Sequence, residues 1–317
     1  MKITSIFLRL GSFAMLFLFL VSFLPLLGCS GNAKSKGKVM LTDADGTTFY
    51  VSKDHRVVSA YGSFAECWLL SGGSLVGVTE DAISERKLEL DEGVQVIGSV
   101  KSVNLEVLIA LEPDFVILSA DLTAHRQLAN ELRARGIAAG LFRVDSFSDY
   151  AELMRQFCLV SGRYDLYKAH VTEVKAKIDS LLSKIPTDKD AKTALIMRAY
   201  SNGIKVKTDN IAEDIAKELG CISLAEQYPS SLTDLSIEKI ITADPVIILV
   251  LTMGNEEDAI GYLKEYVEEN PAFSSLRAVK NGSYVILPKA LFHYKPNNKW
   301  NESYEYLAKI VYPELFK

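Results

Sequence analysis

The chain has 317 residues, of which 35 are Lys or Arg and 40 are Asp or Glu, so its formal net charge is -5. This mildly acidic balance, with no basic stripe carrying interleaved aromatic residues, argues against nucleic acid as a partner. The length predicts two domains of ordinary size, each with its own hydrophobic core.

Residues 1–28 are predicted to be a lipoprotein signal peptide. A basic start and an apolar run over 10–27 lead to Gly28 and Cys29. An apolar stretch, a small residue and then Cys form the bacterial lipobox, in which cleavage leaves Cys29 as an acylated N-terminus. A plain transmembrane anchor is the alternative, because the apolar run is about long enough to span a bilayer. The small, polar and basic residues 29–38 are then expected to form a flexible tether.

The remaining cysteines are Cys67, Cys158 and Cys221. An odd number with no C-x-x-C pair argues against a disulfide framework and against a zinc knuckle. The four histidines are scattered along the sequence, whereas a bare zinc or manganese site needs several ligands at one point. No intrinsic metal or cofactor is therefore expected.

Residues 39–148 predict an N-terminal α/β lobe. It opens with a hairpin, in which 39–41 and 49–51 flank the turn dipeptide Asp45-Gly46. Strands and helices then alternate, which is typical of a parallel sheet with helices on its faces. The predicted elements are strands at 56–60, 75–78 and 137–142 and helices at 63–70 and 124–135.

Residues 149–186 predict one long bridging helix, which begins at a capping box of Asp149 and Glu152 and is interrupted only by Gly162. Residues 187–317 predict a C-terminal α/β lobe with the same alternation. Its expected elements are strands at 194–197 and 284–287 and helices at 211–219, 260–269 and 300–312.

Two stretches, residues 104–118 and 236–250, follow the same plan. Each has a polar capping residue, a Glu two positions later, a short helical pattern, a Pro and an unbroken apolar run. Such a run reads as a buried parallel strand. The repeat predicts two similar lobes, with Glu106 and Glu238 at matching places.

In the order and spacing of these pieces the chain resembles the substrate-binding lipoproteins of ABC importers for ferric siderophores, haem and cobalamin. The matching segments are the hairpin into Arg56-Val57-Val58-Ser59, the Glu66 helix ending at Gly72-Gly73, the run from Gly98 to Glu106, Pro113-Asp114-Phe115, and 307–314. The resemblance implies two α/β lobes joined by one long helix, with the ligand cleft between them. It also implies an extracytoplasmic, lipid-anchored monomer that delivers a metal chelate to a permease dimer served by a separate ATPase.

In this family one acidic residue on each lobe pairs with arginines of the permease, and Glu106 and Glu238 stand at the matching positions. A twofold-symmetric transporter would need an equivalent anionic contact from each lobe. The alternative is that each carboxylate only stabilises the first turn of its helix through the helix dipole.

Ligands of open parallel sheets lie beyond the carboxyl ends of the strands. Aromatic and cationic side chains expected there suit a bulky, flat or anionic ligand. The predicted ligand-binding residues are Tyr61, Lys101, Arg198, Tyr200, Tyr228, His293, Tyr294 and Trp300. Trp300 could equally anchor the last helix in the core.

A ferric siderophore is the first expectation for the ligand, followed by haem or cobalamin. His293, with Met253 or Tyr294 as a second axial ligand, would suit haem, although a lone His in an aromatic loop is more often a hydrogen-bonding residue. The sequence carries no nucleophile elbow, Walker A loop or dinucleotide fingerprint, so an enzyme is not expected. A surface sensor or enzyme on the same scaffold is the alternative.

Overall fold

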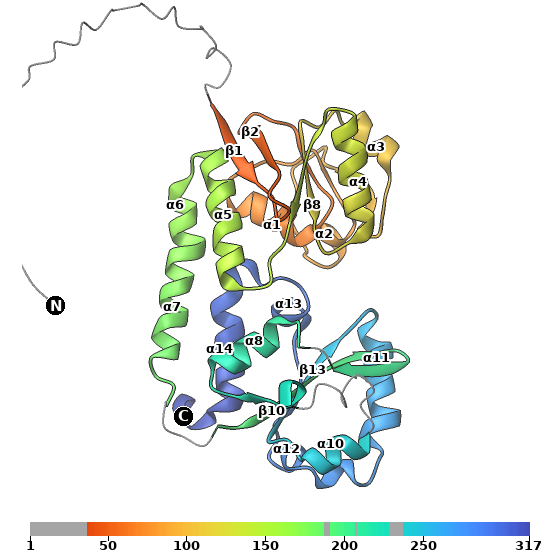
Figure 1. The fold of residues 1–317 in the computed structure, drawn as a ribbon, viewed down its shortest axis with the longest axis vertical. Coiled ribbons are helices and arrows are strands. Elements are labelled where there is room, and N and C mark those ends of the chain that lie inside the picture. The colour runs from red at the N-terminus through yellow and green to blue at the C-terminus, as the bar shows by residue number, and fades with distance from the viewer. Residues whose placement is uncertain (1–36, 187–190, 207, 228–236) are drawn as a thin grey trace, which may run out of the picture. The chain divides into compact units, whose positions relative to one another are not determined.

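The computed structural model describes residues 37–186, 191–206, 208–227 and 237–317 (Figure 1). The first half of this part is built on a five-stranded sheet in which every strand pairing is parallel. Its order is β5 (Gln95–Val96), β4 (Gly77–Val78), β3 (Val57–Ser59), β8 (Phe115–Ser119) and β9 (Ala138–Phe142).

The second half has its own five-stranded sheet. The main path is β11 (Gly203–Val206), β10 (Thr193–Tyr200), β13 (Ile247–Thr252) and β14 (Tyr284–Ile286), and β12 (Ile222–Ser223) pairs with β10. Only the β10–β11 pairing is antiparallel. The predicted α/β class, with two mainly parallel sheets, is confirmed.

Apolar runs become strands here because both faces of each sheet are covered. In β8 Phe115 and Ile117 belong to one hydrophobic cluster, whereas Val116 and Leu118 belong to another on the opposite face. The strand β13 alternates in the same way. A strand buried on both faces has no place for polar residues, which explains the continuous apolar sequence.

The predicted hairpin forms between β1 (Lys38–Thr42) and β2 (Thr48–Ser52), outside the five-stranded sheets. The helices of the first half are α1 (Gly62–Leu70), α2 (Asp81–Ser84), α3 (Leu105–Ala110) and α4 (Thr123–Ala134), and β6 (Gly98–Ser99) and β7 (Ser102–Val103) form a small ladder. The hairpin, α1, α3 and α4 match the sequence-based expectations closely, whereas α2 and the β6–β7 ladder were not predicted.

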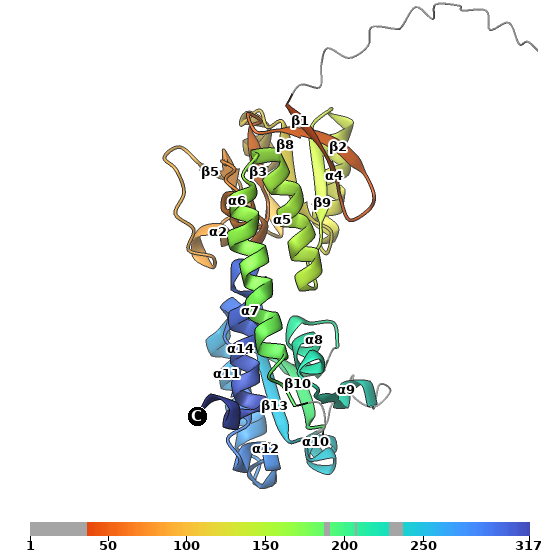
Figure 2. The ribbon, with the colours of Figure 1, turned by 90° about the vertical axis from the view of Figure 1, so that its left-hand side faces the viewer.

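The single helix expected over 149–186 is wrong in its first part. The chain forms α5 (Phe147–Ser161), stops at Gly162 in the left-handed conformation with φ 72°, and restarts in another direction. The second run comprises α6 (Tyr164–Tyr167), a π-helical turn (Lys168–Thr172) and α7 (Glu173–Leu182). Figure 2 shows α6 and α7 along one line with α5 beside α6. Glycine ends the helix because it reaches positive φ without steric cost.

The cap of α5 also differs from the expected one. Ser146 is the N-cap residue and Asp149 is its capping-box partner, so the helix begins earlier than Asp149. The helices that follow the bridging run are α8 (Ile211–Glu218), α9 (Leu224–Gln227), α10 (Ile237–Ala243), α11 (Glu256–Leu263) with a π-helical turn (Lys264–Glu268), α12 (Arg277–Lys280), α13 (Lys289–Phe292) and α14 (Trp300–Val311). Short 3₁₀ turns lie at Phe273–Ser275, Asn297–Lys299 and Pro313–Phe316.

The repeat is visible in the backbone. Glu112 and Asp244, which occupy the same place in the two units, both have positive φ, 46° and 40°. Each precedes a proline, and each links a short helix, α3 or α10, to the buried strand β8 or β13. Positive φ is uncommon for residues other than glycine, so its recurrence at equivalent positions indicates one local structure used twice.

Candidate functional site

A cleft of about 820 Å³ is lined by residues from both halves of the chain. Several of these residues follow the carboxyl ends of strands, where ligands of parallel sheets are expected. Tyr61 follows β3, Asp121 follows β8, Arg143 follows β9 and Met253 follows β13. The volume is in the range of small-molecule binding sites.

The cleft carries four cationic and four acidic side chains. The cations are Arg126, Arg143, Arg198 and Lys295, and the carboxylates are Asp121, Asp145, Asp209 and Asp214. Charged groups of both signs at one cleft give it many directional hydrogen-bonding sites for a polar ligand.

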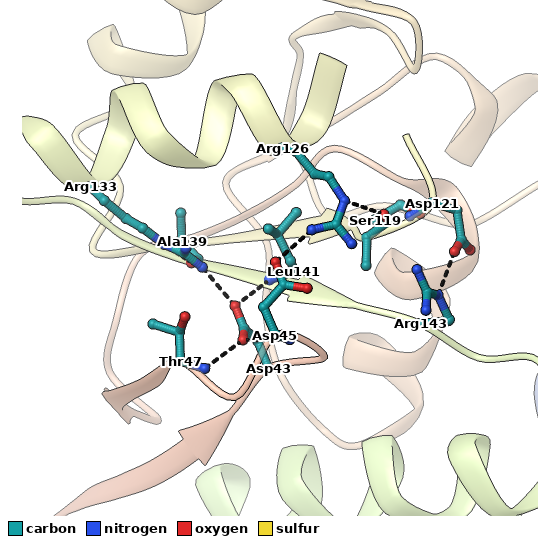
Figure 3. A network of polar contacts seen from close by, with 11 residues as sticks. Asp43, Asp45, Thr47, Ser119, Asp121, Arg126, Arg133, Ala139, Leu141 and Arg143 are labelled. Carbon is teal, nitrogen blue, oxygen red and sulfur yellow. Dashed lines mark hydrogen bonds and ion pairs between the residues drawn. The ribbon is translucent and has the colours of Figure 1, made fainter. Parts of the chain in front are cut away.

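Several of these charges are paired across short distances. The Arg143 Nε donates to Asp121 Oδ1 at 2.7 Å, as Figure 3 shows, and lies 3.8 Å from Asp145 Oδ2. The Lys295 Nζ lies 3.4 Å from Asp145 Oδ1. An anionic ligand that binds Arg143 through Nε must therefore displace a cleft carboxylate.

Arg198 and His293 line the part of the cleft that is formed by the second half of the chain. The Arg198 guanidinium is largely buried and lies 3.2 Å from Asp209 Oδ1. Burial, assisted by the positive charges of Lys289 and Arg198, lowers the pKa of His293 to about 4. The imidazole is consequently neutral at neutral pH and can accept a hydrogen bond or coordinate a metal.

Tyr61 stands at the opposite wall, directly before α1, with its ring 5.0 Å from that of Phe64. Burial and the nearby Asp81 raise the pKa of Tyr61 to about 12. Its hydroxyl is thus a neutral donor and acceptor over the physiological range.

The structure brings Tyr61, Arg198 and His293, together with Met253, to the cleft. Lys101 does not line it, because it is exposed in the turn between β6 and β7. Tyr200 lies within β10, which is longer than predicted, and its ring contacts Lys205 on β11.

The remaining predicted contacts lie elsewhere. Tyr294 is not among the lining residues, and its ring lies against the edge of His293 at 5.1 Å. Trp300 is 2% exposed and packs edge-on against Phe147, which makes it a core residue of α14. Tyr228 lies outside the described residues, as does Cys29.

Arg126, Arg143 and Lys295 also line the cleft, although they were not among the predicted ligand-binding residues. Arg143 could have been found, because it directly follows the correctly predicted strand over 137–142, whose carboxyl end was not considered. Arg126 lies in the first turn of α4 and gives no sequence signal that separates it from other surface arginines on that helix.

Glu106 and Glu238 are both exposed and lie in the first turns of α3 and α10. The Asn104 side chain caps α3 by accepting from the backbone N–H of Glu106 and Val107 at 3.1 Å. The carboxylate of Glu106 is therefore not needed as the cap, and it stays available for a partner.

Within the described residues no cluster of His, Cys, Asp and Glu is suitable for a metal ion. In the same part of the chain no helix combines the length and apolar character needed to cross a membrane. Cys67, Cys158 and Cys221 are free and buried.

Comparison with known proteins gives consistent matches. The family model described as "Periplasmic binding protein" matches residues 57–291. The Fe(3+)-citrate-binding protein YfmC of Bacillus subtilis is 27% identical over 261 residues, which cover 80% of this chain and 79% of YfmC. The putative ABC transporter substrate-binding lipoprotein YhfQ of the same species is 24% identical over 281 residues, covering 83% and 85% of the two chains.

The fold matches solved structures at lower sequence identity. The triscatecholate siderophore-binding protein FeuA from Bacillus subtilis, complexed with ferri-bacillibactin, superposes with a TM-score of 0.69 at 16% identity. The match covers 86% of this chain and 98% of FeuA. A match that covers 86% of this chain includes residues from both of its halves.

Proposed function

Since the chain belongs to the periplasmic binding protein family, we propose that it captures an anionic iron chelate outside the cytoplasm and delivers it to an ABC permease. The observation that carries the proposal is the convergence of Arg126, Arg143, Arg198 and Lys295 on one cleft of about 820 Å³. Guanidinium and ammonium groups recognise carboxylate and catecholate oxygens, which are the exposed donors of such chelates.

A ferric polycarboxylate of the citrate type is the first candidate ligand. The similarity to a protein named for Fe(3+)-citrate binding supports this class. The contact between Asp121 and Arg143 supports it further, because a ligand carboxylate can replace the Asp121 carboxylate there without changing the type of contact.

Haem is the second candidate, and one observation favours it. The neutral imidazole of His293 and the thioether of Met253 both line the cleft. Either could serve as an axial ligand to haem iron. Haem binding would produce a Soret band that changes when His293 is replaced, whereas ferric citrate binding would not.

The protein is further proposed to be a monomer anchored through an acylated Cys29, with Glu106 and Glu238 as its contacts to the two permease subunits. The permease and its ATPase are separate chains in this proposal. The docking role is supported by the exposure of both carboxylates and by their equivalent places in the two repeat units.

The test is a panel titration by isothermal calorimetry on protein beginning near Gly31. Ferric citrate, a ferric tricatecholate, haem and cobalamin are added in separate experiments. Saturable binding of ferric citrate, with weaker or no binding of the other three, supports the proposal. Preference for haem would transfer the assignment to the second candidate, and no binding by any of the four would overturn the chelate assignment.

A further inference from the structure

The turn between β1 and β2 is fixed to the first sheet by Asp43. The Asp43 side chain is completely buried, and its Oδ1 accepts from the backbone N–H of Asp45 at 3.0 Å and of Thr47 at 2.9 Å. Its Oδ2 accepts from Arg133 Nη2 at 2.6 Å and from the N–H of Leu141 at 3.2 Å. Figure 3 shows these contacts around the turn.

A backbone bond strengthens the attachment. The N–H of Ala44 donates to the carbonyl of Leu141 at 2.7 Å, so the turn is bonded to β9, the edge strand of the sheet. A buried carboxylate with four donors can occupy only one arrangement without losing hydrogen bonds. The next turn residue, Asp45, is thereby held at a fixed place.

Asp45 in turn binds Arg126, a residue of the cleft wall. The Arg126 Nη1 donates to Asp45 Oδ2 at 2.6 Å, and its Nε donates to the carbonyl of Ala120 at 2.8 Å. Within the described residues these bonds use Nε and Nη1 and leave the N–H groups of Nη2 for a ligand. Asp45 is not itself a lining residue, whereas Arg126 is.

Arg143 provides an informative contrast. The ion pair of Arg143 with Asp121 is about as exposed as the pair of Arg126 with Asp45. The Arg143 and Asp121 side chains are 46% and 39% exposed, and the Arg126 and Asp45 side chains are 39% and 38% exposed. The two pairs differ in the place of the carboxylate, since Asp121 lines the cleft. Asp121 competes with an anionic ligand for Arg143, whereas Asp45 holds Arg126 from outside the cleft.

We propose that Asp45 is a positioning residue, which fixes the Arg126 guanidinium at the cleft wall as a preformed contact for an anionic ligand. The proposal rests on the proposed function for the nature of the ligand, but the geometry of Arg126 can be tested without it. Preformed donors lose less side-chain entropy on binding, so they add more affinity than mobile ones.

The binding test uses ferric citrate as the probe and compares Asp45→Asn with the matched control Glu131→Gln. Glu131 lies on α4 and pairs with Arg135 at the C-cap of that helix, but neither member of this pair lines the cleft. Removing a negative charge near an anion should by itself tighten binding slightly. Asp45→Asn is expected instead to weaken ferric citrate binding about two- to fivefold, which corresponds to one surface ion pair, while Glu131→Gln leaves it unchanged.

The direction of the change in affinity for ferric citrate distinguishes positioning of Arg126 from a simple effect of the removed charge. Equal or tighter binding by Asp45→Asn would overturn the proposal. A similar loss for a neutral ferric trihydroxamate, if it binds, would also overturn it, because a general structural defect affects both probes. Asp45→Glu should recover part of the affinity.

A second measurement keeps the proposal testable if ferric citrate does not bind, an outcome that would count against the proposed ligand alone. The Nε–Hε resonance of Arg126, assigned with Arg126→Lys, is followed by NMR relaxation in the ligand-free protein. We expect a rigid Arg126 side chain in the unchanged protein and in Glu131→Gln, and a mobile one in Asp45→Asn. Equal rigidity in all three would overturn the proposal.

Discussion

The side-chain amide of Asn297 donates to Glu66 Oε2 at 2.5 Å, so a residue near the C-terminus is bonded to α1 in the first half of the chain. Asn297 is fully buried, also donates to the carbonyl of Ser63 at 2.9 Å, and accepts from the Cys67 thiol. Glu66 is in addition paired with Arg86, whose Nη1 donates to the carbonyl of Lys295 at 3.0 Å. This polar cluster attaches the segment before α14 to the first half.

Asn297→Ala should therefore destabilise the protein by about 2–3 kcal/mol, because it leaves buried partners without hydrogen bonds. The positive φ of 53° adds a small strain for alanine. Urea denaturation measures the free energy of unfolding, with Asn298→Ala as the control. A loss below about 0.5 kcal/mol would show that the cluster contributes little to stability.

Glu106→Ala and Glu238→Ala are predicted to reduce iron uptake without changing the affinity for the chelate. Both carboxylates are exposed and neither lines the cleft, so their removal should affect docking and not chelate binding. We expect roughly a tenfold loss of uptake in the double variant and a smaller loss in each single variant. The measurement is ⁵⁵Fe uptake by cells that carry the cognate permease.

The control for that experiment is the double variant Glu131→Ala, Glu257→Ala, which also removes two exposed carboxylates. It should transport normally. Unchanged uptake by the Glu106/Glu238 double variant would contradict the docking role and favour the helix-dipole alternative.

The lowered pKa of His293 predicts a contribution to pH-dependent stability. Its pKa is about 4 in the folded protein and 6.5 in the unfolded chain. Between these values the unfolded state binds the proton and the folded state does not, so stability falls as the pH decreases from about 6.5 to about 4. His293→Gln should show a flatter profile over this window. Identical slopes for the two proteins in urea melts would contradict the prediction.

The three cysteines of the described part should be unreactive in the native protein. Burial raises the pKa of Cys67, and raises the pKa of Cys158 and Cys221 to about 11 in each case. Because the thiolate is the reactive form, a disulfide reagent should label no cysteine at neutral pH and all three in denaturant. Rapid labelling of the folded protein would show that the core opens readily.

Local patterns predicted most of the fold. The alternation of apolar runs and helical segments predicted the central strands of both sheets, because β8 and β13 are buried on both faces, whereas the short and more exposed strands β5, β11 and β12 were not predicted. The repeat was also correct in detail, because equivalent residues such as Glu112 and Asp244 adopt the same unusual conformation. Gly162 shows the limit of this reasoning: the helical pattern continues on both sides, and tertiary packing decides that the chain reverses there.

The cleft was harder to predict than the sheets. Tyr61 and Arg198 were found because the residues near strand ends follow a topological rule. The sequence could not distinguish a core role from a ligand-binding role for Trp300, because an apolar ring suits a core and a cleft equally. The role of Arg126 depends on Asp45, which is far away in sequence, and no local pattern records that pairing.

The role of the cleft cations is tested most directly by the binding of ⁵⁵Fe-labelled ferric citrate to protein in which Arg198 has been replaced. Equilibrium dialysis compares the unchanged protein with Arg198→Gln and with the control Lys309→Gln, whose pair with Glu305 lies outside the cleft. If the cleft cations bind the chelate, dialysis should show one site per chain, tenfold or greater weakening in Arg198→Gln and no change in the control. Equal affinity in all three proteins would contradict this role, because the chelate would then bind without the charge of Arg198.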